Sequence, residues 1–345
     1  MSSSSPARWA ALPTVKVLVG VAISVGLFGS LLWSVDVGEL LVQLTRTRWE
    51  WVVLSTTLGP LCVWARGRRW WYLFPRGSKP PGLVAATMIG YMANNVLPLR
   101  AGEFVRVYVV ARRWGHGFWT ALATLIVERV LDSLVIVLVM VVLVLRIPVP
   151  RTLEVGAGLL LVVDLVAVAV LGALAVAPAR TRGVMERLTR RWPSLRRRVV
   201  DVLETFVRGL EGVGTRAHLP PILAWTAFIW IMQAVVTWTM FRALSLDVPW
   251  IAAWAVLSFV GLGVAIPSAP GYIGVFHAAA TLALTIFGVP ATTAFGYALL
   301  FHASQILPVT LLGWIYLLRE HVTLADAMAR RGTSTSEPLR QSSGA

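Results

Sequence analysis

Residues 94–106 of this chain read NNVLPLRAGEFVR, and they place two amides, one carboxylate and two guanidinium groups inside a strongly apolar sequence. Charges at membrane depth are costly, so they usually face a protein interior or a water-filled cavity and take part in function. Pro98 and Gly102 interrupt this stretch, and an interrupted helix is tolerated in lipid only where it is buried or lines a cavity. The stretch therefore predicts the bend of a re-entrant or broken helix.

The composition is typical of a polytopic helical membrane protein, since 57% of the 345 residues are hydrophobic and 14% are charged. The formal net charge is +15, and Lys16 and Lys79 are the only lysines, so arginine supplies nearly all basic groups. Arginine binds phosphate through a planar fork, which suits lipid headgroups, although a genome rich in arginine codons explains the bias equally well. The basic residues lie in short loops between apolar runs, so nucleic acid is not an expected partner.

The sequence offers few groups for a soluble catalytic centre. Cys62 is the only cysteine, which excludes an intrachain disulfide and a thiolate metal cluster. The five histidines form no i, i+4 pair beside a carboxylate, and there is no Walker loop, dinucleotide fingerprint or nucleophile elbow. We therefore expect neither a metal site nor a cofactor.

Apolar runs predict an all-α fold with about six full spans and two broken helical hairpins. The spans are expected at residues 15–33, 51–64, 118–145, 156–176, 219–241 and 291–318, and the hairpin legs at 82–97 with 103–114 and at 250–266 with 274–287. Residues 36–50 are expected to form a loop, and Arg66, Arg68 and Arg69 to mark the membrane interface after the second span. Apolar spacing after Pro193 predicts an amphipathic surface helix or a solvated connector helix.

Three segments make up the expected domain organisation. Residues 1–13 form a short N-terminal segment, residues 14–328 the integral membrane domain, and residues 329–345 a polar tail expected to be disordered. Within the membrane domain, one repeat covers about 50–146, a second covers about 219–318, and a basic segment covers about 178–218.

The two repeats are predicted from the breaks themselves. Leu97-Pro98-x-x-x-Gly102 matches Ile266-Pro267-x-x-x-Gly271 at the same spacing. With a short insertion in the second copy, the likeness extends to two further pairs: Gly115 with Gly288, and Glu128-Arg129-x-x-Asp132 with Phe301-His302-x-x-Gln305. The expected helix-breaking residues are Pro98, Gly102, Pro267, Pro270, Gly271 and Gly274.

The distribution of basic loops predicts the direction of each repeat. If each hairpin enters and leaves on one side, the arginine-rich loops 66–79, 112–116 and 180–198 and both termini lie in the cytoplasm, as the positive-inside rule requires. A first hairpin that crossed once would place the loop from Arg180 outside. The hairpins then open to opposite sides, which is the inverted repeat of alternating-access transporters. We expect a multi-pass protein of the cytoplasmic membrane.

Three segments carry a family resemblance: Asn95-x-x-x-x-x-x-Gly102-Glu103-x-x-Arg106, Glu128-Arg129-x-x-Asp132 and Pro267-Ser-Ala-Pro270-Gly271-Tyr-Ile-Gly274. Together they resemble the transmembrane region of lysylphosphatidylglycerol synthases and the stand-alone flippase-like proteins related to it. The resemblance covers most of the chain and implies movement of a lipid between leaflets. The synthases continue into a soluble aminoacyltransferase domain, whereas this chain ends soon after its last span, so lipid aminoacylation is not implied. Tyr272 and His277 stand where the family often has a glycine and an acidic residue.

The leading hypothesis is a flippase for an anionic, aminoacylated or lipid-linked headgroup on a phospholipid or polyprenyl-phosphate-linked lipid. Its candidate headgroup-binding residues are Asn94, Asn95, Arg100, Glu103, Arg106, Glu128, Arg129, Asp132, His277, His302 and Gln305. In this hypothesis arginines hold the headgroup, asparagines donate hydrogen bonds, carboxylates balance the arginines or take up protons, and the last three residues line the opposite vestibule.

Three alternatives remain open. Glu103 could pair with Arg106, and Glu128 and Asp132 with Arg129 or Arg100, so that these groups only brace the fold. A membrane-embedded enzyme that modifies lipid headgroups would use Glu128 and Asp132 as acid and base. A scaffold subunit that transports nothing would tolerate neutralisation of the intramembrane charges.

Overall fold

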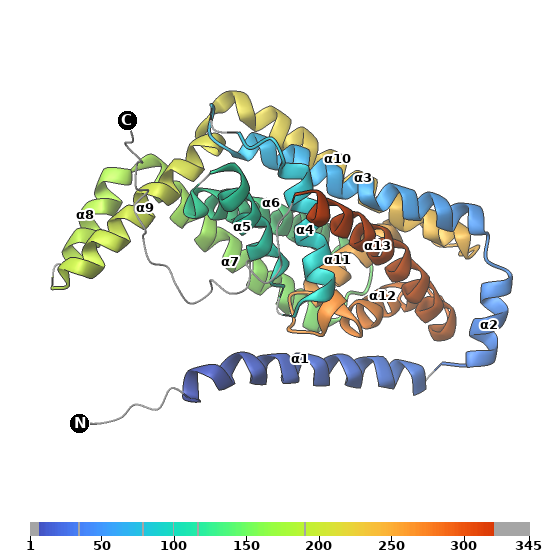
Figure 1. Ribbon diagram of the computed structural model, residues 1–345. Helices are drawn as coiled ribbons and strands as arrows, with labels where there is room; N and C mark the ends of the chain where they lie inside the picture. The colour runs from blue at the N-terminus through green and yellow to red at the C-terminus, as the bar shows by residue number, and fades with distance from the viewer. Residues whose placement is uncertain are drawn as a thin grey trace.

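The computed structural model describes residues 7–33, 35–77, 79–98, 100–115, 117–189 and 191–320, and all regular elements among them are helical (Figure 1). The expected disordered tail at 329–345 lies outside the described residues, and the first helix begins at Ala7, inside the expected N-terminal segment. The helices are α1 (Ala7–Trp33), α2 (Val37–Thr45), α3 (Trp49–Leu73), α4 (Leu83–Val96), α5 (Gly102–Trp114), α6 (Phe118–Val144), α7 (Arg151–Val176), α8 (Pro178–Leu188), α9 (Pro193–Gly214), α10 (Leu219–Ala243), α11 (Ile251–Gly263), α12 (Val275–Thr285) and α13 (Ala291–Arg319), with 3-10 turns η1 (Arg216–His218) and η2 (Pro270–Tyr272).

Helix lengths repeat along the chain in the order long, short, short, long. Helices α3, α4, α5 and α6 have 25, 14, 13 and 27 residues, and α10, α11, α12 and α13 have 25, 13, 11 and 29. Gly115 after α5 and Gly288 after α12 both adopt left-handed backbone, with φ of 66° and 79°, where glycine is favoured. This correspondence matches the repeat predicted from the two Pro-x-x-x-Gly breaks.

The first break follows from local sterics. Leu97, the residue before Pro98, leaves the helix in an extended conformation (φ −98°, ψ 144°), as expected for a residue before proline. The chain then turns back into α5, whose first residue, Gly102, packs so closely on the Gly90 carbonyl of α4 that a Cβ atom would overlap it. The absence of a side chain at Gly102 therefore lets the two legs touch.

The second break is longer, because η2 lies between α11 and α12. Gly271 within η2 and Gly274 before α12 have φ of 68° and 85°. The insertion that the sequence comparison requires in the second copy therefore lies between the break and the start of α12.

The two repeats pack against each other in a reciprocal way. Helix α3 lies along α10, the leg α4 packs on α13 of the other repeat, and the leg α11 packs on α6. Among the described residues, two large hydrophobic clusters fill the interior, one built around α10–α13 and one around α4–α6 with the end of α3, and a small third cluster joins Val63, Met88 and Val309. Each broken hairpin is therefore held by a long helix of the opposite repeat.

Six helices, α1, α3, α6, α7, α10 and α13, have 25 or more residues, enough to cross a bilayer core. By length and apolar composition together, α7, α10 and α13 qualify as spans, and α1 with α2 forms a fourth candidate bent by 84°. Among the side chains of α7, only Ala157 and Asp164 are buried, as expected for a helix surrounded by lipid. The chain is a helical membrane protein.

The prediction of a loop at residues 36–50 was wrong, because α2 occupies Val37–Thr45. Asp36 is its N-cap and accepts a hydrogen bond from the Glu39 backbone N–H at 3.1 Å. The Asp36-x-x-Glu39 spacing is a recognisable helix-start signal.

Figure 1 shows how the ends of the bundle are occupied. The arginine-rich pair α8 and α9 protrudes at one end, while α2 lies at the other.

Candidate functional site

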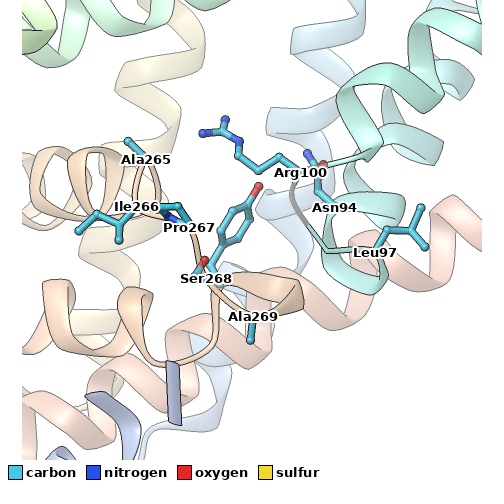
Figure 2. A pocket seen from close by; sticks show the side chains of 9 residues that line it. Asn94, Leu97, Arg100, Ala265, Ile266, Pro267, Ser268 and Ala269 are labelled. Carbon is cyan, nitrogen blue, oxygen red and sulfur yellow. The ribbon is translucent and has the colours of Figure 1, made fainter. Parts of the chain in front are cut away.

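The two breaks meet around a cavity of about 160 Å³. Its lining comes from the first break and from the segment between α11 and α12: Asn94, Leu97, Arg100, Ala265, Ile266, Pro267, Ser268, Ala269 and Tyr272. Figure 2 shows the Arg100 side chain reaching from the first break toward the segment that holds Ala265 and Pro267. Each repeat therefore contributes one wall of the cavity.

Backbone strain is concentrated at this cavity. Among the described residues, the non-glycine positions with positive φ are Arg100 (54°), Tyr272 (60°) and Ser245 (53°), and the first two line the cavity. Left-handed backbone is unfavourable for residues with a Cβ atom and is often retained at functional sites. The Asn94 side-chain oxygen is also buried here without a hydrogen-bond partner.

Asn95 and Gly271 join the two breaks. The Asn95 side-chain amide donates a hydrogen bond to Thr310 Oγ1 on α13 at 2.8 Å. Its backbone carbonyl lies so near Gly271 that a Cβ atom built there would be 3.4 Å away. Asn95 therefore holds the hairpins together and does not line the cavity.

A chain of ion pairs leads inward from Arg100. Arg100 Nη2 lies 2.8 Å from Glu103 Oε1, and the same oxygen lies 3.7 Å from Arg129 Nη1. The three side chains are 39%, 20% and 32% exposed, in the order Arg100, Glu103 and Arg129. These groups are therefore partly exposed, unlike most of the ion-paired groups next to them, and Arg100 also lines the cavity.

Arg129 connects these groups to what we call the arginine cluster, which consists of Arg66, Arg69, Arg106 and Arg129 around Glu128 and Asp132. Arg129 reaches Glu128 at 2.7 Å and Asp132 at 3.3 Å. Asp132 also accepts hydrogen bonds from Arg66 at 2.6 Å and Arg69 at 2.8 Å.

Glu128 is surrounded in the same way. It lies 3.1 Å from Arg106 and 3.6 Å from Arg69, and it is completely buried. Four guanidinium groups thus face two carboxylates, so the arginine cluster has an excess of two positive charges. Uncompensated charge in a buried site is costly, and an anion would relieve it.

The prediction that Arg66 and Arg69 mark the membrane interface was wrong. Helix α3 continues to Leu73, and both side chains are buried inside the protein, whereas Arg68 is exposed. Arg66 also donates a hydrogen bond to Gln233 on α10 at 2.9 Å, so it joins both repeats. The i, i+3 spacing of the two buried arginines on one helix face is the signal that could have identified them.

Some of the ion pairs that the bracing alternative predicts are present in the structure. Glu128 and Asp132 do pair with Arg129, as that alternative expects. Glu103, however, pairs with Arg100 and Arg129, whereas Arg106 points to Glu128 and also lies over the Trp70 ring at 4.8 Å. The i, i+3 pairing of Glu103 with Arg106 is therefore not formed, because Arg106 is on the buried face of α5.

The structure does not bring His277 and His302 to the cavity. Both are buried, with ring centroids 4.7 Å apart, and His302 stacks on Phe276 at 4.4 Å. His302 Nε2 donates to the Gly271 carbonyl at 2.8 Å, and His277 Nδ1 accepts from the Gly274 N–H at 3.3 Å. These two histidines therefore hold the backbone of the second break.

Gln305 and helix α1 support the same region. The Gln305 amide donates to the Ser55 carbonyl on α3 at 3.3 Å and to Ser304 Oγ at 3.0 Å. On α1, Ser24 Oγ accepts a hydrogen bond from the Ala269 N–H at 2.8 Å. The polar contacts of the second repeat are thus hydrogen bonds between uncharged groups, whereas those of the first repeat are mainly ion pairs.

Comparison with known proteins places this architecture in a family. The family model described as the lysylphosphatidylglycerol synthase TM region matches residues 17–313. One curated relative is the glycosyltransferase AglD of Haloferax volcanii, which is 29% identical over 230 residues, 58% of this chain and 37% of the relative. The chain thus spans little more than a third of that relative. No solved structure matches the chain. The protein belongs to the family of the lysylphosphatidylglycerol synthase transmembrane region.

Proposed function

We propose that this protein is a membrane lipid flippase that moves a lipid with an anionic headgroup from one leaflet to the other. The observation that carries the proposal is the cavity between the two breaks, to which one repeat contributes Arg100 and the other Tyr272. Two hairpins that open to opposite sides and share one site are the parts that alternating access requires. A phospholipid or a polyprenyl-phosphate-linked lipid carries the negative charge that the arginines favour.

The proposed substrate leaves chemically unchanged. The cavity would receive the headgroup, while exposed apolar side chains of the surrounding helices stay in contact with the acyl or prenyl chains. Transport and chemistry can be separated in one preparation: after the assay, lipids extracted from the liposomes are analysed by mass spectrometry. A released or modified headgroup would favour the enzyme hypothesis instead.

Leaflet-resolved lipid movement in proteoliposomes tests the proposal. We expect purified protein to accelerate reduction by dithionite of fluorescently labelled inner-leaflet phosphatidylglycerol or polyprenyl phosphate, with and without a pH gradient. Arg100→Gln should lower the initial rate at least about tenfold, because it removes the accessible positive charge of the cavity. No acceleration for any lipid of the panel would contradict the proposal.

Arg151→Gln is the matched control for this experiment. Arg151 forms an i, i+3 ion pair with Glu154 at 2.7 Å near the start of α7, as Arg100 does with Glu103 near the start of α5. The Arg151 side chain is 86% exposed and is not part of the cavity lining. Its substitution should leave the rate unchanged, so an equal loss in both variants would indicate a nonspecific effect of arginine removal.

We also propose that the end of the bundle with α8 and α9 faces the cytoplasm, in the cytoplasmic membrane. Single cysteines introduced on a Cys62→Ser background, Arg187→Cys on α8 and Glu39→Cys on α2, can be treated with a membrane-impermeant maleimide. In intact cells or spheroplasts, only the cysteine on α2 should react. Labelling of the α8 cysteine under the same conditions would reverse the orientation.

A further inference from the structure

We propose that Glu103 is a displaceable internal anion, which holds Arg100 and Arg129 together until the phosphate group of a substrate headgroup replaces it. This inference deepens the proposed function and rests on it for the identity of the site. It assigns Arg100 and Arg129 as the two arms of a phosphate clamp, with Glu103 as the group that keeps the clamp occupied between transport events.

The geometry of Glu103 carries the first step. A single oxygen, Oε1, contacts both guanidinium groups, at 2.8 Å from Arg100 and 3.7 Å from Arg129. Arg129 Nη2 is engaged with Glu128 and Asp132, so its Nη1 is the donor that faces Glu103. One carboxylate oxygen cannot satisfy this donor and the parallel donors of the Arg100 fork together. A phosphate group has more oxygens and can engage both at once, so it would outcompete the carboxylate.

Accessibility distinguishes this layer from the rest of the arginine cluster. Arg66, Arg69 and Arg106 have side chains 8%, 0% and 2% exposed, whereas Arg100 and Arg129 are 39% and 32% exposed. Glu103 lies between them in the first turn of α5, directly after the break that lines the cavity. The clamp therefore lies on the more exposed side of the arginine cluster, next to Arg100 of the cavity lining.

Charge balance supplies the third step. The arginine cluster has two more positive than negative charges, and the Arg100–Glu103 pair adds none. A phosphate monoester with a charge of about −1.5 to −2 would balance this excess, which Glu103 leaves uncorrected. Displaced Glu103 then becomes a free carboxylate beside the cavity, ready to re-form the clamp and expel the headgroup.

Calorimetric titration of detergent-purified protein tests the clamp without requiring transport. The probes are inorganic phosphate and dihexanoylphosphatidic acid, which share the phosphate and differ in the lipid tails. Glu103→Gln keeps the shape of the side chain and removes its charge, so we expect roughly fivefold tighter binding of at least one probe. Glu103→Asp, which is too short to reach both arginines, should give a smaller increase.

Glu154→Gln is the control, because it breaks the exposed pair with Arg151 and should leave binding unchanged. Thermal unfolding of each variant verifies that it is folded. Tighter binding of both probes by Glu103→Gln supports a clamp for phosphate itself, and tighter binding of the lipid probe alone supports a clamp for a lipid phosphate. Unchanged or weaker binding of both probes by folded Glu103→Gln and Glu103→Asp would overturn the inference.

Lipid movement measured on the same variants separates this inference from the proposed function. If Glu103 must expel the headgroup, Glu103→Gln should bind phosphate more tightly and yet transport several-fold more slowly. Tighter binding in a protein that moves no lipid would leave the clamp standing and remove the flippase proposal. Normal transport by Glu103→Gln with unchanged phosphate binding would keep the flippase proposal and remove the clamp.

Discussion

The two broken hairpins of this protein have similar helix lengths on either side of a break, but they differ in chemistry. In the first, α4 and α5 lead to Arg100, Glu103 and the arginine cluster. In the second, α11 and α12 lead to an uncharged region in which His277 and His302 pack among phenylalanine rings. The order of long and short helices is repeated, whereas the polar groups are not, so the two halves surround an asymmetric site.

The difference implies that losing a polar partner costs more free energy of folding in the first repeat than in the second. Buried charges in the first repeat depend on their partners, since an ion left without its counterion in a low-dielectric interior is strongly unfavourable. Neutral hydrogen bonds in the second repeat contribute less individually. Substitutions at corresponding positions should therefore have unequal effects on stability.

The largest expected effect is at the aligned pair Asp132 and Gln305. Asp132→Ala leaves Arg66 and Arg69 without their shared carboxylate and should lower the free energy of unfolding by about 3–5 kcal/mol. Gln305→Ala removes neutral hydrogen bonds to Ser55 and Ser304 and should cost about 1 kcal/mol. Denaturant unfolding in detergent measures both, and equal losses would break the comparison between the repeats.

The glycines of the two breaks should show a smaller contrast. Gly102→Ala places a methyl group against the Gly90 carbonyl and should cost about 1–3 kcal/mol through overpacking. Gly271→Ala has room for its Cβ atom but adopts a left-handed backbone, so about 1–2 kcal/mol is expected. Temperature-dependent aggregation of the detergent-solubilised variants reports the order, and a neutral Gly102→Ala would show that the hairpin legs can separate.

His302→Leu sharpens the account of the second break. The substitution keeps an apolar side chain next to Phe276 but removes the donor to the buried Gly271 carbonyl, so a loss of about 1–2 kcal/mol is expected. Transport should persist in the fraction of protein that folds, because the side chain does not line the cavity. Complete loss of transport at normal stability would instead place His302 in the transport site.

The smallest effect on stability is expected for Arg100→Gln, at less than about 1 kcal/mol, because its ion pair with Glu103 is partly exposed. The same substitution should have the largest effect on lipid movement. Unfolding and transport measured on one preparation therefore separate bracing from function in the first repeat. If Arg100→Gln destabilised the protein as strongly as Asp132→Ala, the result would support the bracing alternative.

Local sequence determined much of this architecture. Long apolar runs gave the positions of the spans, and Pro98 and Pro267 gave the breaks, because proline and glycine act on the backbone of their own segment. The repeat followed from the same local signals. Helix α2 also begins at a local signal, Asp36-x-x-Glu39, although the mixed charges of residues 36–50 predict a loop there.

Only the tertiary structure decided which charged groups meet. Whether Arg66 faces lipid headgroups or Asp132 depends on how far α3 extends and where α6 packs, and neither follows from residues next to it in sequence. The same holds for Glu103, whose partners are Arg100 and Arg129 and not Arg106, and for the histidines that brace the second break. Sequence alone established a membrane protein with two matching breaks, since backbone preferences are local, and the fold placed one charged cavity between them, since ion pairing acts through space.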